Sequence, residues 1–349
     1  MKYHLIFIFA AIMAVADCET SAACTRVLYQ GPNNTVMTGR TMDWSENPHS
    51  NLWIFPRGMR RNGAAGANSV EWRSKYGSVI TAAYDICTTD GMNEKGLVAN
   101  LLWLAESKYP ALNPKRPALS ISVWAQYVLD NFATVNEAVT ALSRNEFDVI
   151  TDKMPDGSRT ATLHLSISDA SGDSAIFEYI DGRLKIHHNR AYTVMTNSPV
   201  FDQQLALDDY WNNIGGLIFL PGTNRAADRF VRASFYIGVV PKTDDMRTAA
   251  AALFGVIRNV SVPFGISTPS EPNIASTRWR TVSDQKNLRY FYESTLYPFL
   301  LWVDFKDADF AEGAQVKMLA PESDNEYIGN CTAHFTPSAP FVFQSIGAE

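Results

Sequence analysis

The sequence predicts an α+β protein built in layers, and three observations lead to this class. Short runs of alternating apolar and polar residues, joined by Asp-Gly and Ser-Gly pairs, predict antiparallel strands. Apolar residues at helical spacing predict helices that are segregated from the strands. The predicted order is strands, two helices, strands, two helices, strands. A four-layer αββα sandwich, in which two antiparallel sheets lie between helical layers, satisfies this order.

The first group of strands starts with a predicted hairpin. Two short apolar runs, 26–30 and 35–41, flank the turn sequence Gly31-Pro32-Asn33-Asn34. The other strands of this group are expected at 51–56, 78–84 and 96–104. We expect a turn at Asp90-Gly91, between the last two strands, and a loop over 58–77, which is rich in Gly, Arg and Asn.

The first two helices are expected after these strands. Four apolar residues fall on one face at helical spacing: Ile121, Trp124, Val128 and Leu129. Thr134-Val135-Asn136-Glu137 matches a capping box, so a second helix should begin near Thr134 and run to about Arg144. The later elements are a strand meander at 163–168, 175–180 and 184–186, helices at 225–239 and 244–260, and strands at 278–282 and 288–292.

The N-terminal residues are expected to be a signal peptide rather than part of the fold. Lys2 and His4 precede the apolar run 5–16, and Ser21-Ala22-Ala23 forms a small-residue cleavage site. The run is too short for a membrane span, which needs about 20 apolar residues. We therefore expect residues 1–23 to be removed from an exported protein, periplasmic or secreted, that has no stable membrane anchor. A membrane-anchored N-terminal helix is the alternative.

Cleavage after Ala23 would make Cys24 the first residue of the mature chain. Two other possibilities stay open. Cys24 could be lipidated, although Ser21 stands where a lipoprotein signal prefers an apolar residue, or cleavage after Ala16 could leave a short propeptide. The segment 24–349 contains no linker or internal repeat and is expected to form one domain. The net charge of −6 argues against a nucleic-acid partner.

An N-terminal cysteine carries its own base. An α-amino group has a pKa of about 7.7–8.0 and can accept the thiol proton near neutral pH. The resulting thiolate attacks acyl carbon readily. Arg40 is a permanent cation that would stabilise the thiolate, and Asp43 can bind the amine. The later residues Cys87 and Cys331 could pair in an oxidising compartment or remain two buried thiols.

Four segments together are similar to one known family. Cys24 at the cleavage site, followed by Gly39-Arg40-Thr41-Met42-Asp43-Trp44, resembles the choloylglycine hydrolase family of N-terminal nucleophile amidases. The later segments that resemble this family are Met92-Asn93-Glu94-Lys95-Gly96-Leu97, Met195-Thr196-Asn197-Ser198-Pro199-Val200-Phe201 and Arg229-Phe230-Val231-Arg232. The family includes penicillin V acylases and conjugated bile salt hydrolases. The resemblance implies the N-terminal nucleophile hydrolase fold, which is an αββα sandwich.

The resemblance also implies roles for the matching residues. Cys24 would be the nucleophile and its amine the base. Arg40 would polarise the thiol, and Asp43 would hold the amine. Asn197 would donate its side-chain amide to the oxyanion, and Arg229 would be a second cation that supports the site. No metal and no cofactor are expected.

The second oxyanion donor implied by the resemblance is the backbone N–H of Trp103. Family bile salt hydrolases carry Asn at this position and some penicillin V acylases carry Tyr, so Trp103 is a departure. With Trp44 it could form two aromatic walls for an aryl or linear acyl chain, as in the Gram-negative branch that includes penicillin V acylases. The alternative is that both indoles belong to the core. Between Tyr210 and Arg229 the chain lacks the long loop through which some relatives form tetramers, so a homo-oligomer is left open.

Other catalytic patterns in the sequence are weak. Ser283-Asp284-Gln285-Lys286 matches the Ser-x-x-Lys pattern of penicillin-recognising serine enzymes but resembles a strand or turn rather than a helix start. His187-His188 would point to opposite faces of a strand, and Cys331 with His334 lacks further ligands at zinc spacing.

The sequence therefore predicts an exported cysteine amidase that hydrolyses a linear amide bond of an N-acylated small molecule. It would be similar to penicillin V acylases, with N-acyl homoserine lactones as a further substrate class. The alternatives are a conjugated bile salt hydrolase, or an exported binding protein that keeps the fold without catalysis.

Overall fold

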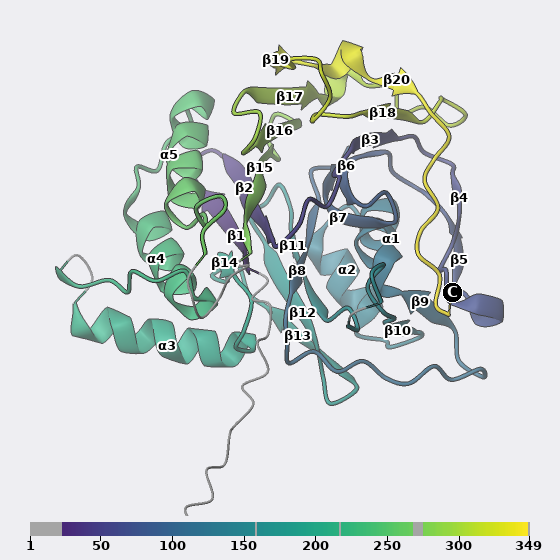
Figure 1. Ribbon diagram of the computed structural model, residues 1–349, viewed down its shortest axis with the longest axis horizontal. Helices are drawn as coiled ribbons and strands as arrows, with labels where there is room; N and C mark the ends of the chain where they lie inside the picture. The colour runs from purple at the N-terminus through teal and green to yellow at the C-terminus, as the bar shows by residue number, and fades with distance from the viewer. Residues whose placement is uncertain (1–22, 158, 216–217, 268–274, 348–349) are drawn as a thin grey trace, which may run out of the picture.

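Two β-sheets stacked face to face form the centre of the structure (Figure 1). The computed structural model describes residues 23–157, 159–215, 218–267 and 275–347, so the expected signal peptide lies outside the described residues except for Ala23. One sheet has seven strands, in the spatial order β14 (Val194–Met195), β1 (Ala23–Gln30), β2 (Val36–Trp44), β15 (Ser276–Asp284), β16 (Arg289–Ser294), β17 (Leu300–Asp304) and β19 (Gly329–Asn330). The other has nine, in the order β13 (Arg183–His188), β12 (Ser174–Ile180), β11 (Leu163–Ser168), β8 (Val98–Trp103), β7 (Cys87–Asn93), β6 (Ser78–Ala83), β3 (Leu52–Phe55), β18 (Lys317–Leu319) and β20 (Thr336–Pro337).

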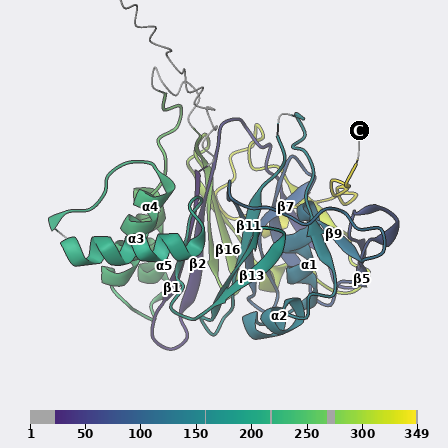
Figure 2. The ribbon, with the colours of Figure 1, turned by 90° about the horizontal axis from the view of Figure 1, so that it is seen from below.

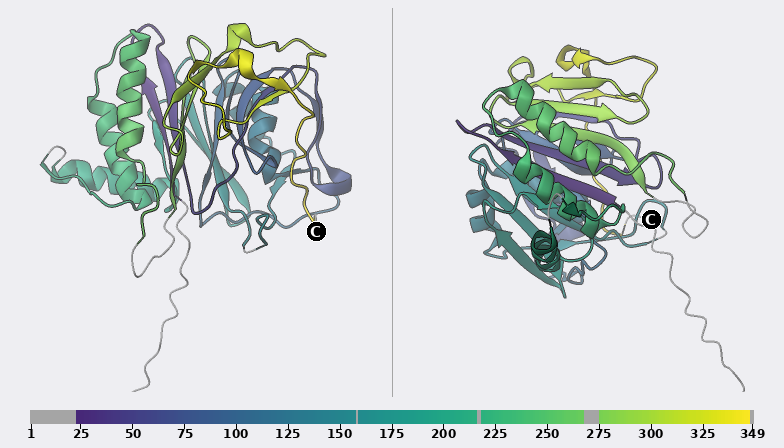
Figure 3. Two further views of the ribbon diagram at one scale, coloured as in Figure 1. Left: turned by 45° about the horizontal axis from the view of Figure 1, so that its top comes forward. Right: turned by 90° about the vertical axis from the view of Figure 1, so that its left-hand side faces the viewer.

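Helices lie on the two outer sides of this pair of sheets. On the side of the seven-stranded sheet are α3 (Phe201–Ile214), α4 (Ala226–Val239) and α5 (Met246–Asn259); on the side of the nine-stranded sheet are α1 (Trp124–Asn131) and α2 (Val135–Leu142). Seen from below in Figure 2, the layers follow one another as helices, sheet, sheet and helices. In the right-hand view of Figure 3 the green helices lie in front of the purple strands β1 and β2, on which α4 and α5 pack. The predicted αββα sandwich is confirmed. No helix in the described ranges is long and apolar enough to span a membrane.

Short elements connect these layers. They are β4 (Arg60–Asn62) paired with β5 (Glu71–Arg73), β9 (Ala118–Ser120) paired with β10 (Asp148–Ile150), and the 3-10 turns η1 (Gly66–Asn68), η2 (Ile121–Val123), η4 (Phe305–Asp307) and η5 (Thr332–His334). The expected loop over 58–77 is wrong in part, because β4 and β5 form a hairpin within it. In this hairpin the Gly63 N–H donates to the Val70 carbonyl oxygen at 2.8 Å. Its three-residue strands are too short to produce a recognisable alternation of apolar and polar residues.

The Asp90-Gly91 pair lies inside β7, contrary to the predicted turn. The chain turns instead at Tyr84 and Asp85, whose φ angles are 53° and 50°. Glycine is needed within β7 because a Cβ at Gly91 would lie only 2.6 Å from Cγ2 of Ile80 on the neighbouring strand. The glycine that suggested a turn is thus explained by close packing between two strands.

The predicted N-terminal hairpin is confirmed as β1 and β2, and its register sets the geometry of the site. Cys24 lies opposite Met42, and Ala23 lies opposite Asp43. Cross-strand partners share one face of a sheet, and the faces alternate along each strand. Cys24 and Arg40 therefore face the nine-stranded sheet, whereas Asp43 faces the helical layer.

The cap of α2 predicted at Thr134 is confirmed, although the return bond from Glu137 reaches Ala133, one residue before the N-cap. The Thr134 hydroxyl accepts a hydrogen bond from the Glu137 N–H at 3.2 Å, and the Glu137 carboxylate accepts one from the Ala133 N–H at 2.8 Å. The helix ends slightly earlier than expected. Helix α3 was not predicted, because it buries only Phe201 and Gln204 and therefore shows no apolar stripe.

We expect substitution of Gly39 by valine to destabilise the fold. Gly39 lies in β2 under α5, where a Cβ would come within 2.9 Å of Ile257 and 3.1 Å of Leu253. Overpacking of this kind costs about 1–3 kcal/mol, which should appear as a lower urea midpoint. The matched control is Gly255→Ala on the exposed side of α5, where nothing lies within 4 Å of the added Cβ and a gain of about 0.5–1 kcal/mol is expected. Unchanged stability of Gly39→Val would contradict this close approach.

Candidate active site

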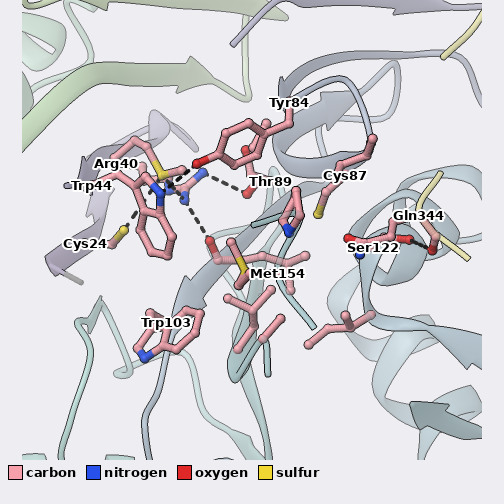
Figure 4. Close-up of a pocket in the computed structure, with 18 residues that line it drawn as sticks. Cys24, Arg40, Trp44, Tyr84, Cys87, Thr89, Trp103, Ser122, Met154 and Gln344 are labelled. Atoms are coloured by element: carbon pink, nitrogen blue, oxygen red, sulfur yellow. Dashed lines mark hydrogen bonds between the residues drawn. The ribbon is translucent and has the colours of Figure 1, made fainter. Parts of the chain in front are cut away.

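Cys24 lies near the start of β1, at the wall of a pocket between the sheets (Figure 4). The residue is only 2% exposed. Its Sγ is 3.9 Å from the backbone oxygen of Asp43 and 4.0 Å from Sδ of Met42. The pocket is partly open to solvent and is lined mostly by apolar side chains, as small-molecule sites commonly are. The sulfur therefore borders a cavity that can hold a small acyl group.

Two indoles form much of the apolar pocket wall beside the sulfur. The rings of Trp44 and Trp103 are 5.6 Å apart and tilted by 53°. The guanidinium of Arg159 lies 4.3 Å from the Trp103 ring centroid, and the Trp44 indole N–H donates to the Tyr84 hydroxyl at 2.9 Å. Both indoles line the cavity and form a small cluster apart from the two large cores. Tyr84 and Arg159 were missed in the sequence, since no local pattern points to them.

Arg40 lies on the same face of the hairpin as Cys24. Its guanidinium donates to the carbonyl oxygens of Thr89 at 2.8 Å and Leu101 at 2.7 Å, and the Asp90 carboxylate is 3.7 Å away. These bonds hold a buried cation close to the sulfur. Burial raises the pKa of the Cys24 thiol above its ordinary value, while the charge of Arg40 acts in the opposite direction.

Asn197 joins several predicted site residues at one point. Its Oδ1 accepts hydrogen bonds from the backbone nitrogen of Cys24 at 2.5 Å and from the Arg229 guanidinium at 2.8 Å. Its amide nitrogen donates to the Trp103 carbonyl oxygen at 2.7 Å. The two residues expected to bind an oxyanion, Asn197 and Trp103, therefore lie together beside Cys24.

The backbone N–H of Trp103 takes no part in the ladder between β8 and β11. Trp103 lies opposite Leu163, and the adjoining pair is joined by a bond of 2.9 Å from the Leu104 N–H to the Thr162 carbonyl oxygen. Because hydrogen-bonded and non-hydrogen-bonded pairs alternate in antiparallel sheets, Trp103 and Leu163 form a non-hydrogen-bonded pair. The Trp103 N–H therefore points to the strand edge on which its carbonyl meets Asn197.

Arg229 brings the helical layer into the site. This fully buried residue of α4 donates to the Cys24 carbonyl oxygen at 2.6 Å, the Thr25 hydroxyl at 2.5 Å and the Asn224 carbonyl oxygen at 3.0 Å, besides its bond to Asn197. Such a fork of donors fixes the start of β1 in position. Burial lowers the pKa of Arg229.

Asp43 lies on the face of the hairpin that packs against the helices. Its partner across the hairpin is Ala23, which is still attached to Cys24. The Asp43 carboxylate is 3.9 Å from the Arg229 guanidinium and accepts hydrogen bonds from the hydroxyls of Thr277 at 2.5 Å and Thr41 at 3.2 Å. Burial raises the pKa of the Asp43 carboxyl to about 6, although Arg229 and the two hydroxyls act to lower it. A cation placed close to Asp43 would therefore stabilise the ionised form of this buried carboxyl.

Behind Asn197 lies a buried carboxylate that the sequence analysis missed. Glu178 is 3.2 Å from Nδ1 of His164 and 3.2 Å from Nε2 of His187. The other ring nitrogen of His164 is 2.8 Å from the carbonyl oxygen of Thr196, which precedes Asn197. Burial acts to raise the pKa of Glu178, but the hydrogen bonds with both histidines outweigh it and lower this pKa to about 2. A lone acid within an otherwise apolar strand was the available signal.

The other candidate motifs do not add to the site. His187 and His188 do point to opposite faces, and His188 lies 2.8 Å from the Asp173 carboxylate. Cys87 and Cys331 are unpaired, although Cys87 lines the pocket. Over the described part of the chain, no group of three or more His, Cys, Asp or Glu side chains could hold a metal ion.

The assembled thiol, buried cations and amide donors can support nucleophilic attack on a carbonyl group.

Comparisons with known proteins agree on one family. The model of a family described as linear amide C–N hydrolases, choloylglycine hydrolase family, matches residues 24–319. A penicillin V acylase of Pectobacterium atrosepticum is 53% identical, with 93% of each chain covered. A bile salt hydrolase/transferase of Clostridium perfringens is 27% identical, with 78% of this chain and 89% of the relative covered.

Solved structures give the same result. The structure of penicillin V acylase from Agrobacterium tumefaciens matches with a TM-score of 0.87 and 57% identity, over 93% of this chain and all of the other. A mutant conjugated bile acid hydrolase from Clostridium perfringens matches with a TM-score of 0.74 and 22% identity, over 87% of this chain and 98% of the other. This second likeness concerns the fold alone.

We expect Glu178→Gln to destabilise the protein in a pH-dependent way. The pKa of Glu178 falls from an ordinary value of 4.5 to about 2 on folding, so its ionised form contributes stability that is fully present above about pH 4.5 and is lost as the pH falls toward 2. The variant should lose roughly 2–3 kcal/mol at pH 7 and clearly less at pH 3.5, measured by urea unfolding. The control is Asp173→Asn, which alters the partly exposed contact between Asp173 and His188 and should have little effect at either pH. An equal loss for Glu178→Gln at both pH values would contradict this assignment.

Proposed function

Because the chain belongs to the choloylglycine hydrolase family of linear amide C–N hydrolases, we propose that Cys24 is its nucleophile once residues 1–23 have been removed. The observation that carries this proposal is that the sulfur and the backbone nitrogen of Cys24 both lie at the candidate site. Its sulfur borders the apolar pocket, and its backbone nitrogen lies 2.5 Å from Oδ1 of Asn197, which also binds the Trp103 residue of the pocket wall. Removal of Ala23 would convert that nitrogen into an amine on the residue that carries the thiol.

The proposed reaction is acyl transfer in two steps. The α-amine of Cys24 accepts the thiol proton, the sulfur attacks the amide carbonyl carbon, and the C–N bond breaks as the protonated amine leaves. Water then hydrolyses the thioester, with the same amine as base. Arg40 favours the thiolate. The Trp103 N–H and the second hydrogen of the Asn197 amide hold the oxyanion.

We further propose that the acyl group is aryl or unbranched. The two indoles beside Cys24 form flat apolar walls, which suit the phenoxyacetyl group of penicillin V or the acyl chain of an N-acyl homoserine lactone. The similarity to two penicillin V acylases supports this choice. A fused steroid is a poorer fit, because the bulky side chain of Trp103 stands at the pocket wall.

The proposed location is outside the cytoplasm, in the periplasm or medium. The signal-peptide pattern of residues 1–23 supports it, and so does the family match that begins at Cys24 itself. Residues 24–349 would then form the single mature domain. In the described chain Ala23 is buried in β1 opposite Asp43, so the Cys24 nitrogen stays an amide until this residue is removed.

Turnover of three amides tests the nucleophile and the acyl class together. The mature protein should release amine from penicillin V and from a long-chain N-acyl homoserine lactone faster than from glycocholate. Cys24→Ser should lose at least about a thousandfold in kcat/KM, because a hydroxyl is far less acidic than a thiol. Thr25→Ser, which keeps a hydroxyl for Arg229, is the control and should stay active. Retention of turnover in Cys24→Ser would refute the nucleophile, and preference for glycocholate would refute the acyl class.

Processing can be tested separately by the mass of the N-terminal peptide. When the full chain is expressed in a Gram-negative host, the recovered protein should begin at Cys24. Ala23→Arg should block cleavage, because the residue before the cut must be small, and should leave no measurable turnover. Ala22→Arg places the same charge one position earlier, where a larger residue is tolerated, and should be processed normally. Full activity of uncleaved Ala23→Arg protein would exclude the α-amine as the base.

A further inference from the structure

Residues 341–347 include Gln344, which lines the pocket at the end that lies away from Cys24. They contain no helix or strand, and the family match ends earlier, at residue 319. We call this stretch the closing segment. Its position is unexpected from the sequence, because nothing in its pattern of residues points to the pocket.

Aromatic contacts fix the start of the closing segment on the nine-stranded sheet. The ring of Phe341 lies 5.3 Å from that of Trp53 in β3 and 4.8 Å from that of Phe343. Phe343 is buried, and the guanidinium of Arg61 lies 5.6 Å from its ring centroid. These contacts make the segment a packed part of the fold rather than a loose end.

Gln344 binds three separate stretches of chain that line the pocket. Its N–H donates to the Ile86 carbonyl oxygen at 3.0 Å, and its carbonyl oxygen accepts from the hydroxyls of Ser120 and Ser122 at 2.9 Å each. Its side-chain amide donates to the Lys153 carbonyl oxygen at 2.8 Å. The pocket is lined by Ile86, Ser122 and Met154 from these stretches, and by Gln344 itself.

The close-up places this junction opposite the nucleophile. In Figure 4, Gln344 and Ser122 lie on the far side of the pocket from Cys24, with Cys87 between them. Between these two ends the wall is almost entirely apolar. An acyl chain whose carbonyl carbon lies at the sulfur would therefore extend toward Gln344.

We propose that the closing segment is the end wall of the acyl pocket and that Gln344 sets the longest acyl chain the pocket accepts. This inference rests on the proposed function, because it takes the pocket as the acyl site. Each methylene buried in an apolar pocket raises affinity about fourfold. A chain that reaches the Gln344 side chain gains nothing further, because this side chain occupies the next position along the pocket and is held there by its bond to Lys153.

The test measures binding of linear fatty acids, the products of hydrolysis, and so needs no turnover. Dissociation constants for acids of six to sixteen carbons are measured by calorimetry with the mature Cys24→Ala protein. Affinity should rise with each carbon and then level off. In Gln344→Ala the affinity should level off at chains about two carbons longer. The longest acids should bind about fifteenfold more tightly, while the six-carbon acid binds as before.

Two further variants separate size from disruption of the fold. Gln344→Met keeps the length of the side chain without its amide, and should restore a limit close to the original one. Val342→Ala changes an 80% exposed residue of the same segment and should leave the profile unchanged. Two results would show that Gln344 does not set the longest chain. One is that the affinity of Gln344→Ala levels off at the same chain length as that of the unaltered protein. The other is that Val342→Ala shifts this length by the same amount.

Failure of this inference can be told apart from failure of the proposed function. An unchanged length profile together with loss of turnover in Cys24→Ser would refute the end wall and leave the nucleophile intact. A shifted profile together with an active Cys24→Ser would keep the end wall and refute the nucleophile. The third outcome is that no acid binds to the Cys24→Ala protein although its unchanged urea midpoint shows that it is folded. This outcome would also refute the end wall, because the pocket would then not be an acyl site.

Discussion

The geometry of the site depends on the buried guanidinium of Arg229. It binds the backbone of Cys24 and the hydroxyl of Thr25 at the start of β1, and the side chain of Asn197 in a distant part of the chain. A buried charge that loses its partners costs several kcal/mol. The folded state is therefore favoured only when α4, the start of β1 and the stretch after β14 are all in place. The site therefore forms only when the helical layer has packed on the seven-stranded sheet, and no single segment of the chain forms it alone.

The register of β1 and β2 then divides the site into two faces. Cys24 and Arg40 face the second sheet, where the pocket lies, while Thr25 and Asp43 face the helices and the Arg229 guanidinium. One hairpin can thus present the proposed nucleophile and a cation on one side and its own positioning contacts on the other. A one-residue slip would exchange the two sets, so the hairpin turn and the buried residues on both faces must agree on one register.

The features that could be predicted from the sequence are those determined by interactions between residues close together in the chain. The first hairpin and the helix cap at Thr134 follow from turn and cap chemistry within a few residues, and both are present. Gly91 was misplaced because its reason, the nearby Ile80 side chain, belongs to another strand. The closing segment and Glu178 were missed for the same reason, since their partners are distant in sequence. Residue chemistry alone suggested Cys24; the positions of Asn197 and Arg229 came from the family resemblance, because no spacing rule joins residues 173 positions apart.

The burial of Cys24 bears on when such a nucleophile could act. In the chain with Ala23 attached, burial raises the pKa of the thiol and Arg40 offsets only part of the effect, so the sulfur is held as a neutral thiol. The nearby Asp43 carboxyl, with a pKa of about 6, is a poor place for a charge without a further cation. The proposed removal of Ala23 would supply both missing groups at once, a base for the thiol and an ammonium partner for the carboxylate. Burial would then keep the sulfur unreactive until the chain is processed.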